Sequence, residues 1–302
     1  MKYVLLIIMC VIYLLSTGCG GSSSTKAPAG SIEKPVLAVT LLPQKYFVEQ
    51  IAGDKYDILV MIPPGHNAAT YSPTTQQMQT LSKAKLYLKS GNILFESAWM
   101  DSLASNNKEM KIIDTSAGVD FIKGHDHKHE HGAPSDVDPK TGIDPHIWLS
   151  PKAVKIQAKN ILDAIISIDN QNHQLYETNY NKFIEAIDAL DSEIKTKLSE
   201  CKSKKFMVFH PAWSYFCRDY GLEQISIEGE GKSPSPAALK EAIDLAKKEN
   251  IRIIFIQSQF DSALAQSVAN EINGKAVTLN PLAEDWMKGM KDLTQALYET
   301  LK

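Results

Sequence analysis

The chain has 302 residues, of which 44% are hydrophobic, and this is enough to form one or two packed cores. The formal net charge is only −3, so a protein that binds nucleic acid through a basic excess is excluded. The informative part of the composition is the placement of its eight histidines and four cysteines.

Residues 1–18 are typical of an export signal, because Lys2 precedes an apolar stretch that is too short to span a bilayer. The stretch ends in Leu15-Ser16-Thr17-Gly18-Cys19, which resembles a bacterial lipobox. We therefore expect lipidation at Cys19, with residues 19–31 as a flexible Gly/Ser-rich tether. An ordinary cleaved signal, or an uncleaved anchor, is the alternative. The mature protein is expected outside the cytoplasm, attached to the cell membrane by its lipid.

Beyond the tether, short runs of β type alternate with helical segments. In the first half, strands are expected at 36–42, 56–62, 84–89 and 111–114, with helices around 47–52, 73–84 and 151–168. In the second half, strands are expected at 206–209, 224–227, 251–256 and 276–279, with helices at 212–220, 236–249, 262–272 and 286–301. This alternation predicts an α/β fold with parallel sheets.

Residues 173–202 break that alternation, because they read as one long helix without Gly or Pro. Its apolar residues recur at steps of three and four, which places them on one stripe. The helix can link two α/β lobes, which we expect at 32–172 and 203–302, or simply pack as an amphipathic helix. Ligands of open α/β sheets bind at the carboxyl ends of the strands, so a cleft between the lobes should be lined there.

Two cysteines remain once Cys10 leaves with the signal and Cys19 is lipidated. An exported protein could pair Cys201 with Cys217, or bury both as separate thiols, and the sequence leaves these readings open. Two cysteines alone would lack the ligands for a zinc site.

Three histidines far apart in the sequence lie in loops, directly beside a predicted strand or helix. His66 follows a strand after Pro63-Pro64-Gly65, His146 precedes a helix, and His210 follows the strand at 206–209. Any one of them alone would more often be a structural histidine. Together they suit a cage of neutral nitrogens for a divalent metal of borderline softness, which zinc is.

Four further histidines lie close together in a polar stretch at 123–142, namely His125, His127, His129 and His131. Such tracts bind Zn²⁺, Ni²⁺ or Cu²⁺ with modest affinity, so we interpret the stretch as an auxiliary metal loop. A solvated loop of accidental composition is the alternative.

Three segments carry a resemblance to a known family. Asp-Pro-His-Ile-Trp-Leu-Ser-Pro at 144–151, Phe-His-Pro-Ala-Trp-Ser-Tyr-Phe at 209–216 and Gly-Lys-Ser-Pro-Ser-Pro at 231–236 resemble the metal-binding solute receptors of ABC transporters. The resemblance implies a two-lobed receptor, not an enzyme, that captures Zn²⁺ as cargo and delivers it to the membrane permease of an ABC importer. It further suggests a monomer, a periplasmic location in a Gram-negative host, and possible help from a metallochaperone.

By position in these segments, His146 matches the family's second metal ligand and His210 its third. Manganese-type members usually have a carboxylate at the third position, so His210 favours zinc. The family's first ligand, a histidine, would align with Ala69, and we expect His66, three residues earlier, to fill the vacancy.

The family's fourth ligand is usually an aspartate, and here Asn280 stands in its place. An amide oxygen is a weaker partner for Zn²⁺ than a carboxylate. The shell could instead be completed by water or by one of four nearby carboxylates, Glu228, Glu230, Glu284 or Asp285.

Other functions compete with the zinc receptor. A metalloenzyme fits three protein ligands and an open position, but the chain offers no His-Glu-x-x-His element. A receptor for manganese or another divalent metal, and a surface adhesin that acts without metal, are the remaining alternatives.

Deleting residues 125–131 should leave the tight zinc site intact and remove only weaker additional sites, because so polar a stretch cannot build a preorganised cage. Calorimetric zinc titration of the deleted and full-length chains should give the same affinity for the first equivalent. Loss of that first equivalent would make a histidine of the stretch a primary ligand.

Overall fold

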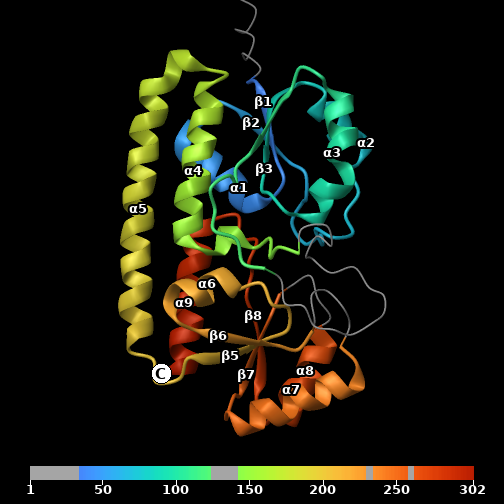
Figure 1. Ribbon diagram of the computed structural model, residues 1–302, viewed down its shortest axis with the longest axis vertical. Helices are drawn as coiled ribbons and strands as arrows, with labels where there is room; N and C mark the ends of the chain where they lie inside the picture. Colours follow the sequence, from blue (N-terminus) through green and yellow to red (C-terminus); the bar gives the residue numbers. More distant parts are fainter. Residues whose placement is uncertain (1–33, 124–141, 229–233, 258–261) are drawn as a thin grey trace, which may run out of the picture. The chain divides into compact units, whose positions relative to one another are not determined.

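The computed structural model describes residues 34–123, 142–228, 234–257 and 262–302 (Figure 1). The expected signal, the tether with Cys19, Glu230 and the four loop histidines, His125, His127, His129 and His131, lie outside these described residues. Within the described ranges, no helix combines the length and apolar character that crossing a bilayer requires. Lys34–Lys302 forms one compact unit.

Two four-stranded sheets, parallel throughout, organise this unit and confirm the predicted α/β class. The first has the order β2-β1-β3-β4, with bounds β1 Val36–Val39, β2 Asp57–Val60, β3 Ala84–Lys89 and β4 Lys111–Asp114. The second repeats this order as β6-β5-β7-β8, with β5 Lys205–Val208, β6 Glu223–Ser226, β7 Ile253–Ile256 and β8 Lys275–Thr278. Every predicted strand is present: two have the expected bounds, three are shorter than expected, and three have the expected length but begin one residue earlier.

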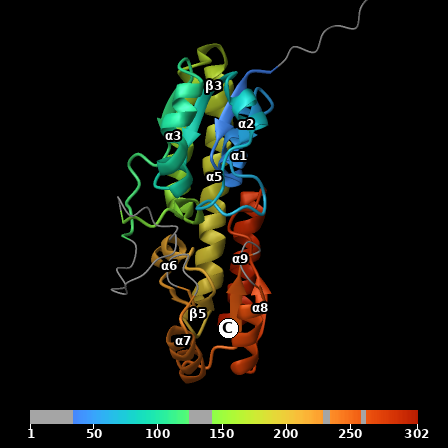
Figure 2. The same cartoon turned by 90° about the vertical axis from the view of Figure 1, so that its right-hand side faces the viewer.

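Helices cover both faces of the first sheet. α1 (Leu42–Ala52) and α4 (Pro151–Ile166) pack on one face, while α2 (Thr75–Leu81) and α3 (Leu94–Asn106) lie on the other (Figures 1 and 2). The sequence did not predict α3, because its apolar residues do not gather on a single stripe. Its buried positions include a carboxylate, Glu96.

The second sheet is covered in the same manner. α6 (Ser214–Tyr220) and α9 (Trp286–Leu301) pack against β6 and β5. α8 (Ser262–Glu271) packs on β7 and β8, and α7 (Pro236–Lys248) lies against α8. The 3₁₀ turn η1 (Ile147–Leu149) precedes α4, and η2 (Asn170–Asn172) leads into the next helix.

The long helix is confirmed as α5 (His173–Ser199), with 27 residues. At 1.5 Å per residue it is about 40 Å long, and it passes both sheets in both views (Figures 1 and 2). It packs against α1 and α4 in the first half and against α9 and α6 in the second. The predicted stripe is largely its buried face, with Tyr176, Phe183, Ile187, Leu190, Ile194 and Leu198.

Two tryptophans join the halves. The indole nitrogen of Trp286 donates to the carbonyl oxygen of Trp148 at 2.7 Å, and the indole of Trp148 donates to the carbonyl oxygen of Pro281 at 2.8 Å. Phe47 of α1 meets the Trp286 ring edge-on at 5.4 Å. These residues belong to one core shared by the two sheets, so the halves are packed together.

The two remaining cysteines are free, buried thiols in the structure. Burial raises the pKa of Cys217 to about 12, which keeps this thiol protonated and unreactive at neutral pH. Of the two readings that the sequence left open, the structure has the separate thiols.

A buried carboxyl group ties α3 to the first sheet. Glu96, only 3% exposed, accepts hydrogen bonds from the backbone N–H groups of Ser90 at 2.6 Å and Gly91 at 3.0 Å, and from the Thr40 hydroxyl. Burial raises the pKa of Glu96 to about 7, and these hydrogen bonds offset the effect only in part. Since Thr40 follows β1 and Ser90 follows β3, one side chain holds two strand ends in place.

Because its folded pKa is raised, Glu96 adds stability that is fully present below its unfolded pKa and is lost as pH rises through about 7. The loss should amount to about 3 kcal/mol of unfolding free energy. Glu96→Gln should flatten this part of the pH profile in urea unfolding between pH 5 and 8. Glu109→Gln, at an exposed position, is the control. Equal slopes for wild type and Glu96→Gln would contradict the assignment.

Candidate metal centre

His146 lies in the segment of the chain that connects β4 to α4, where two prolines and the 3₁₀ turn η1 fix the backbone. Its ring nitrogen Nδ1 lies 2.8 Å from Oδ1 of Asp144, and its backbone N–H donates to the same oxygen at 2.9 Å. Burial by itself would raise the pKa of Asp144, but the charge of the His146 ring and its hydrogen bonds outweigh burial and lower it. The carboxylate is therefore ionised and sets the orientation of the ring.

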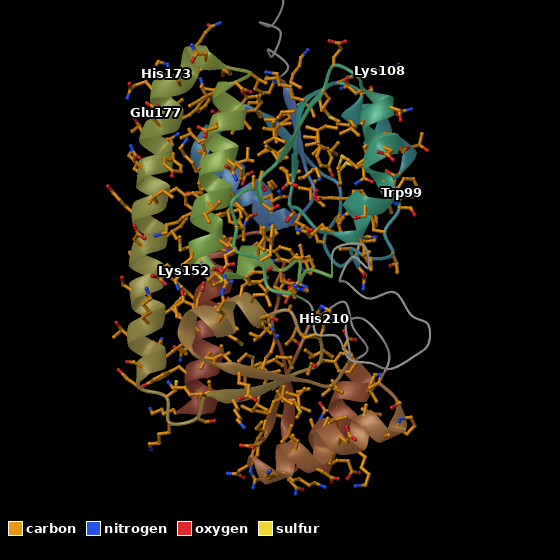
Figure 3. The ribbon with its side chains drawn as sticks, viewed as in Figure 1. Trp99, Lys108, Lys152, His173, Glu177 and His210 are labelled. Carbon is orange, nitrogen blue, oxygen red and sulfur yellow. The ribbon has the colours of Figure 1, made fainter. Side chains whose placement is uncertain are left out.

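His210 directly follows the β5 segment, as expected for a residue at the carboxyl end of a strand. It is 3% exposed, and its Nδ1 is hydrogen-bonded to the carboxylate of Glu228, which follows β6. β5 and β6 are parallel neighbours, so their carboxyl ends meet at one edge of the sheet. Figure 3 shows His210 on the side of the second sheet nearer the first.

The two imidazole rings meet through their other nitrogens. Nε2 of His146 and Nε2 of His210 are 3.3 Å apart, and the ring centroids are separated by 5.2 Å. An ionised carboxylate can only accept, so each Nδ1 donates, and in the neutral form of each ring the lone pair is on Nε2. Two lone pairs then face each other, an arrangement that a cation or a shared proton would stabilise.

The separation of these two nitrogens suits one metal ion. Nitrogens bound to a tetrahedral Zn²⁺ at about 2.0–2.1 Å lie about 3.3 Å apart. A carboxylate on the far nitrogen of a metal-bound histidine is the usual arrangement in zinc sites, because it fixes the ring and raises its basicity. The pair therefore has both the spacing and the supporting carboxylates of a zinc centre.

A tyrosine from the second half supports the His146 segment. The Tyr215 hydroxyl, on α6, donates to the carbonyl oxygen of Asp144 at 2.7 Å and accepts the backbone N–H of Ile122 at 3.1 Å. An antiparallel bridge between Lys123 and Ile143 closes the chain beside it. The two ends of the histidine-rich stretch are thus held next to Asp144.

The structure brings together only two of the three predicted histidines. His66 is exposed, its Nδ1 lies 3.1 Å from the Pro64 carbonyl oxygen, and its ring meets Tyr71 edge-on at 4.9 Å. Among the residues that the structure describes, no group of three His, Cys, Asp or Glu is placed to hold a metal ion. The assignment of His66 as a ligand stays a prediction.

The groups named for the fourth position are engaged elsewhere. Asn280 is exposed, and its Oδ1 accepts the backbone N–H of Leu282 at 3.0 Å. Glu284 forms an ion pair with Lys45, and Asp285 caps the start of α9. Asn280 as a ligand likewise stays a prediction.

Sequence reasoning missed how the two carboxylates act. Asp144 was quoted only as part of a motif, and Glu228 was considered only as a direct ligand. In the structure each receives Nδ1 of a histidine. Asp144 could have been recognised from its position two residues before His146, but the contact between Glu228 and His210 depends on the pairing of β5 with β6.

Comparison with known proteins places this geometry in context. The family model described as zinc-uptake complex component A, periplasmic (ZnuA), matches residues 37–300. The chain is 28% identical over 281 residues to the high-affinity zinc uptake system protein ZnuA of Bacillus subtilis strain 168, which covers 92% of this chain and 88% of that protein.

Two further similarities extend this result. The zinc-binding lipoprotein AdcA of Streptococcus pneumoniae is 28% identical over 286 residues, but this chain spans only 54% of its length, against 92% of the chain itself. The crystal structure of a ZnuA deletion mutant with zinc bound superposes with a TM-score of 0.81 at 36% identity, and the match covers 89% of this chain and 98% of that one.

Glu228→Gln should weaken zinc binding about 10- to 100-fold, because an amide fixes the His210 tautomer less well and leaves the ring less basic. Competition with a chromophoric chelator measures the affinity. Asp188→Asn, which removes a surface ion pair with Lys155, is the matched control. Unchanged affinity in Glu228→Gln would mean that this carboxylate does not support a ligand.

Proposed function

Since the chain belongs to the zinc-uptake complex component A family, we propose that it is an extracytoplasmic receptor that captures Zn²⁺ and delivers it to an ABC importer. The family is one of metal-binding solute receptors and not of enzymes, as the sequence predicted. Zinc is the cargo of such a receptor and not a resident cofactor.

One observation supports this function most directly, the 3.3 Å approach of Nε2 of His146 to Nε2 of His210. In the neutral imidazole rings both Nε2 nitrogens can donate an electron pair to a metal ion. Such nitrogen ligands suit Zn²⁺ better than the harder Mn²⁺. Manganese or another divalent metal is the second candidate, and metal analysis of protein purified from unsupplemented medium separates the two.

In this proposal His66 and Asn280 are the third and fourth protein ligands. Asn280 must give up its hydrogen bond to the Leu282 N–H before its oxygen can bind a metal. His66 must move with the loop that carries it, away from the Pro64 carbonyl. Water occupies any position that neither side chain reaches, as it does in zinc sites with three protein ligands.

The cellular setting is also proposed. Lipidation at Cys19 would attach the receptor to the membrane through the tether at 19–31, so that the lobes at 32–172 and 203–302 and the helix between them remain extracytoplasmic. AdcA, named a lipoprotein, supports the anchor. The partner is the permease of an ABC importer. The receptor is proposed to act as a monomer, with a metallochaperone as a further partner.

His210→Ala should lower zinc affinity more than about 100-fold, because it removes a direct ligand where loss of a supporting group already costs 10- to 100-fold. The fold should survive, since the residue lies at a strand end and not within a strand. Isothermal titration calorimetry at pH 7.5 gives the affinity, and circular dichroism checks the fold.

His173→Ala provides the matched control. His173 is an exposed histidine at the end of α5 remote from His210 (Figure 3), so its loss should leave the affinity unchanged. Unaltered zinc binding in a folded His210→Ala variant would overturn the proposed function.

A further inference from the structure

The carboxyl edge of the second sheet carries a buried polar residue beyond the histidine and its carboxylate. Glu228 follows β6, His210 follows β5, and Gln257 follows β7, the other neighbour of β5. The ladders continue toward this edge, because the N–H of Phe209 donates to the carbonyl of Phe255 at 2.8 Å and that of Glu228 to the carbonyl of Phe209 at 3.0 Å. Three neighbouring strands therefore end in polar side chains at one edge.

The pleat of the strands directs Gln257 to the same face as His210. Phe209 of the β5 segment and Ile256 of β7 both pack in a small core on one face of the sheet. Successive side chains of a strand point to opposite faces. The next residues, His210 and Gln257, are therefore directed to the other face, where His210 meets its carboxylate and His146.

The side-chain nitrogen of Gln257 is a buried donor without a hydrogen-bond partner among the described residues. The residue as a whole is 4% exposed. Buried polar atoms are nearly always paired, and an unpaired one in a native protein needs an explanation such as a water molecule or an ion at the site. Here the unpaired donor lies at the end of the strand next to His210.

We propose that Gln257 is a positioning residue of the metal site, whose Nε2–H donates a hydrogen bond to a water molecule bound to the captured ion. The inference rests on the proposed function. The two imidazoles fill two of the four positions of a tetrahedral ion, and water fills a position that His66 or Asn280 does not reach. An amide N–H is repelled by the cation itself but binds the oxygen of its water, and being neutral it leaves the charge of the site unchanged.

Gln257→Leu removes this donor while keeping a side chain of similar size. It should weaken zinc binding about tenfold, as loss of a supporting contact to a metal ligand does. It should also change the visible absorption of the Co²⁺-loaded protein, which reports the geometry and ligands of the ion. A purely structural role for the amide would not alter that spectrum.

The chain offers a matched control in Gln157. This residue of α4 is fully buried, and neither of its side-chain amide atoms has a partner in the described residues. Gln157→Leu removes the same kind of unpaired amide about two helical turns into α4, so zinc affinity and the Co²⁺ spectrum should stay as in the wild type. Unfolding curves of both variants show whether stability alone has changed.

Equal zinc affinity and an identical Co²⁺ spectrum in wild type and Gln257→Leu would overturn the inference while leaving the proposed function standing. Failure of the wild type to bind zinc would instead overturn the proposed function, and the inference with it. If Gln257→Leu does not fold, Gln257→Glu decides. A carboxylate there should displace the water, tighten zinc binding and alter the Co²⁺ spectrum, and no change in either would also overturn the inference.

Discussion

Two buried indole N–H groups hold the segment that carries His146 against the second half of the protein. Trp286 donates to the carbonyl of Trp148, and Trp148 donates to the carbonyl of Pro281. Leaving either donor unpaired in the core would cost about 1–3 kcal/mol, so the two bonds oppose sliding of one half against the other. The Nε2 to Nε2 distance between His146 and His210 depends on this register, because each histidine comes from a different half.

Both histidine rings are buried, and each keeps a hydrogen-bond partner. Each ring is hydrogen-bonded to a carboxylate on one side and faces the other ring on the second side. In the proposed function, zinc and protons would compete for the same Nε2 lone pairs, so acidification should favour release of the metal. The single helix α5 packs against helices of both halves and so joins the halves in addition to the two tryptophan hydrogen bonds. The fold therefore holds the two rings in place.

Much of the fold could be predicted, and the exceptions have physical causes. The strands could be predicted because apolar β-type runs end at Gly, Pro or polar residues. The helix α5 could be predicted because its apolar stripe is long and regular. α3 was missed since its buried face includes Glu96, a charged residue type that sequence patterns assign to solvent. Its burial depends on donors from Thr40, Ser90 and Gly91, which come together only when β1 and β3 pair.

By itself, the sequence determined the α/β class, the long helix, the family and the two histidines that meet, because these depend on local patterns and on motifs written in consecutive residues. Only the tertiary structure decided which atoms face each other. Glu228 reaches His210, and Gln257 ends the next strand, because of the strand order β6-β5-β7, which no local pattern specifies. The structure likewise placed His66 in an exposed loop. A ligand set is a property of three-dimensional distances, and spacing along the chain constrains those distances only within a single turn, helix or strand.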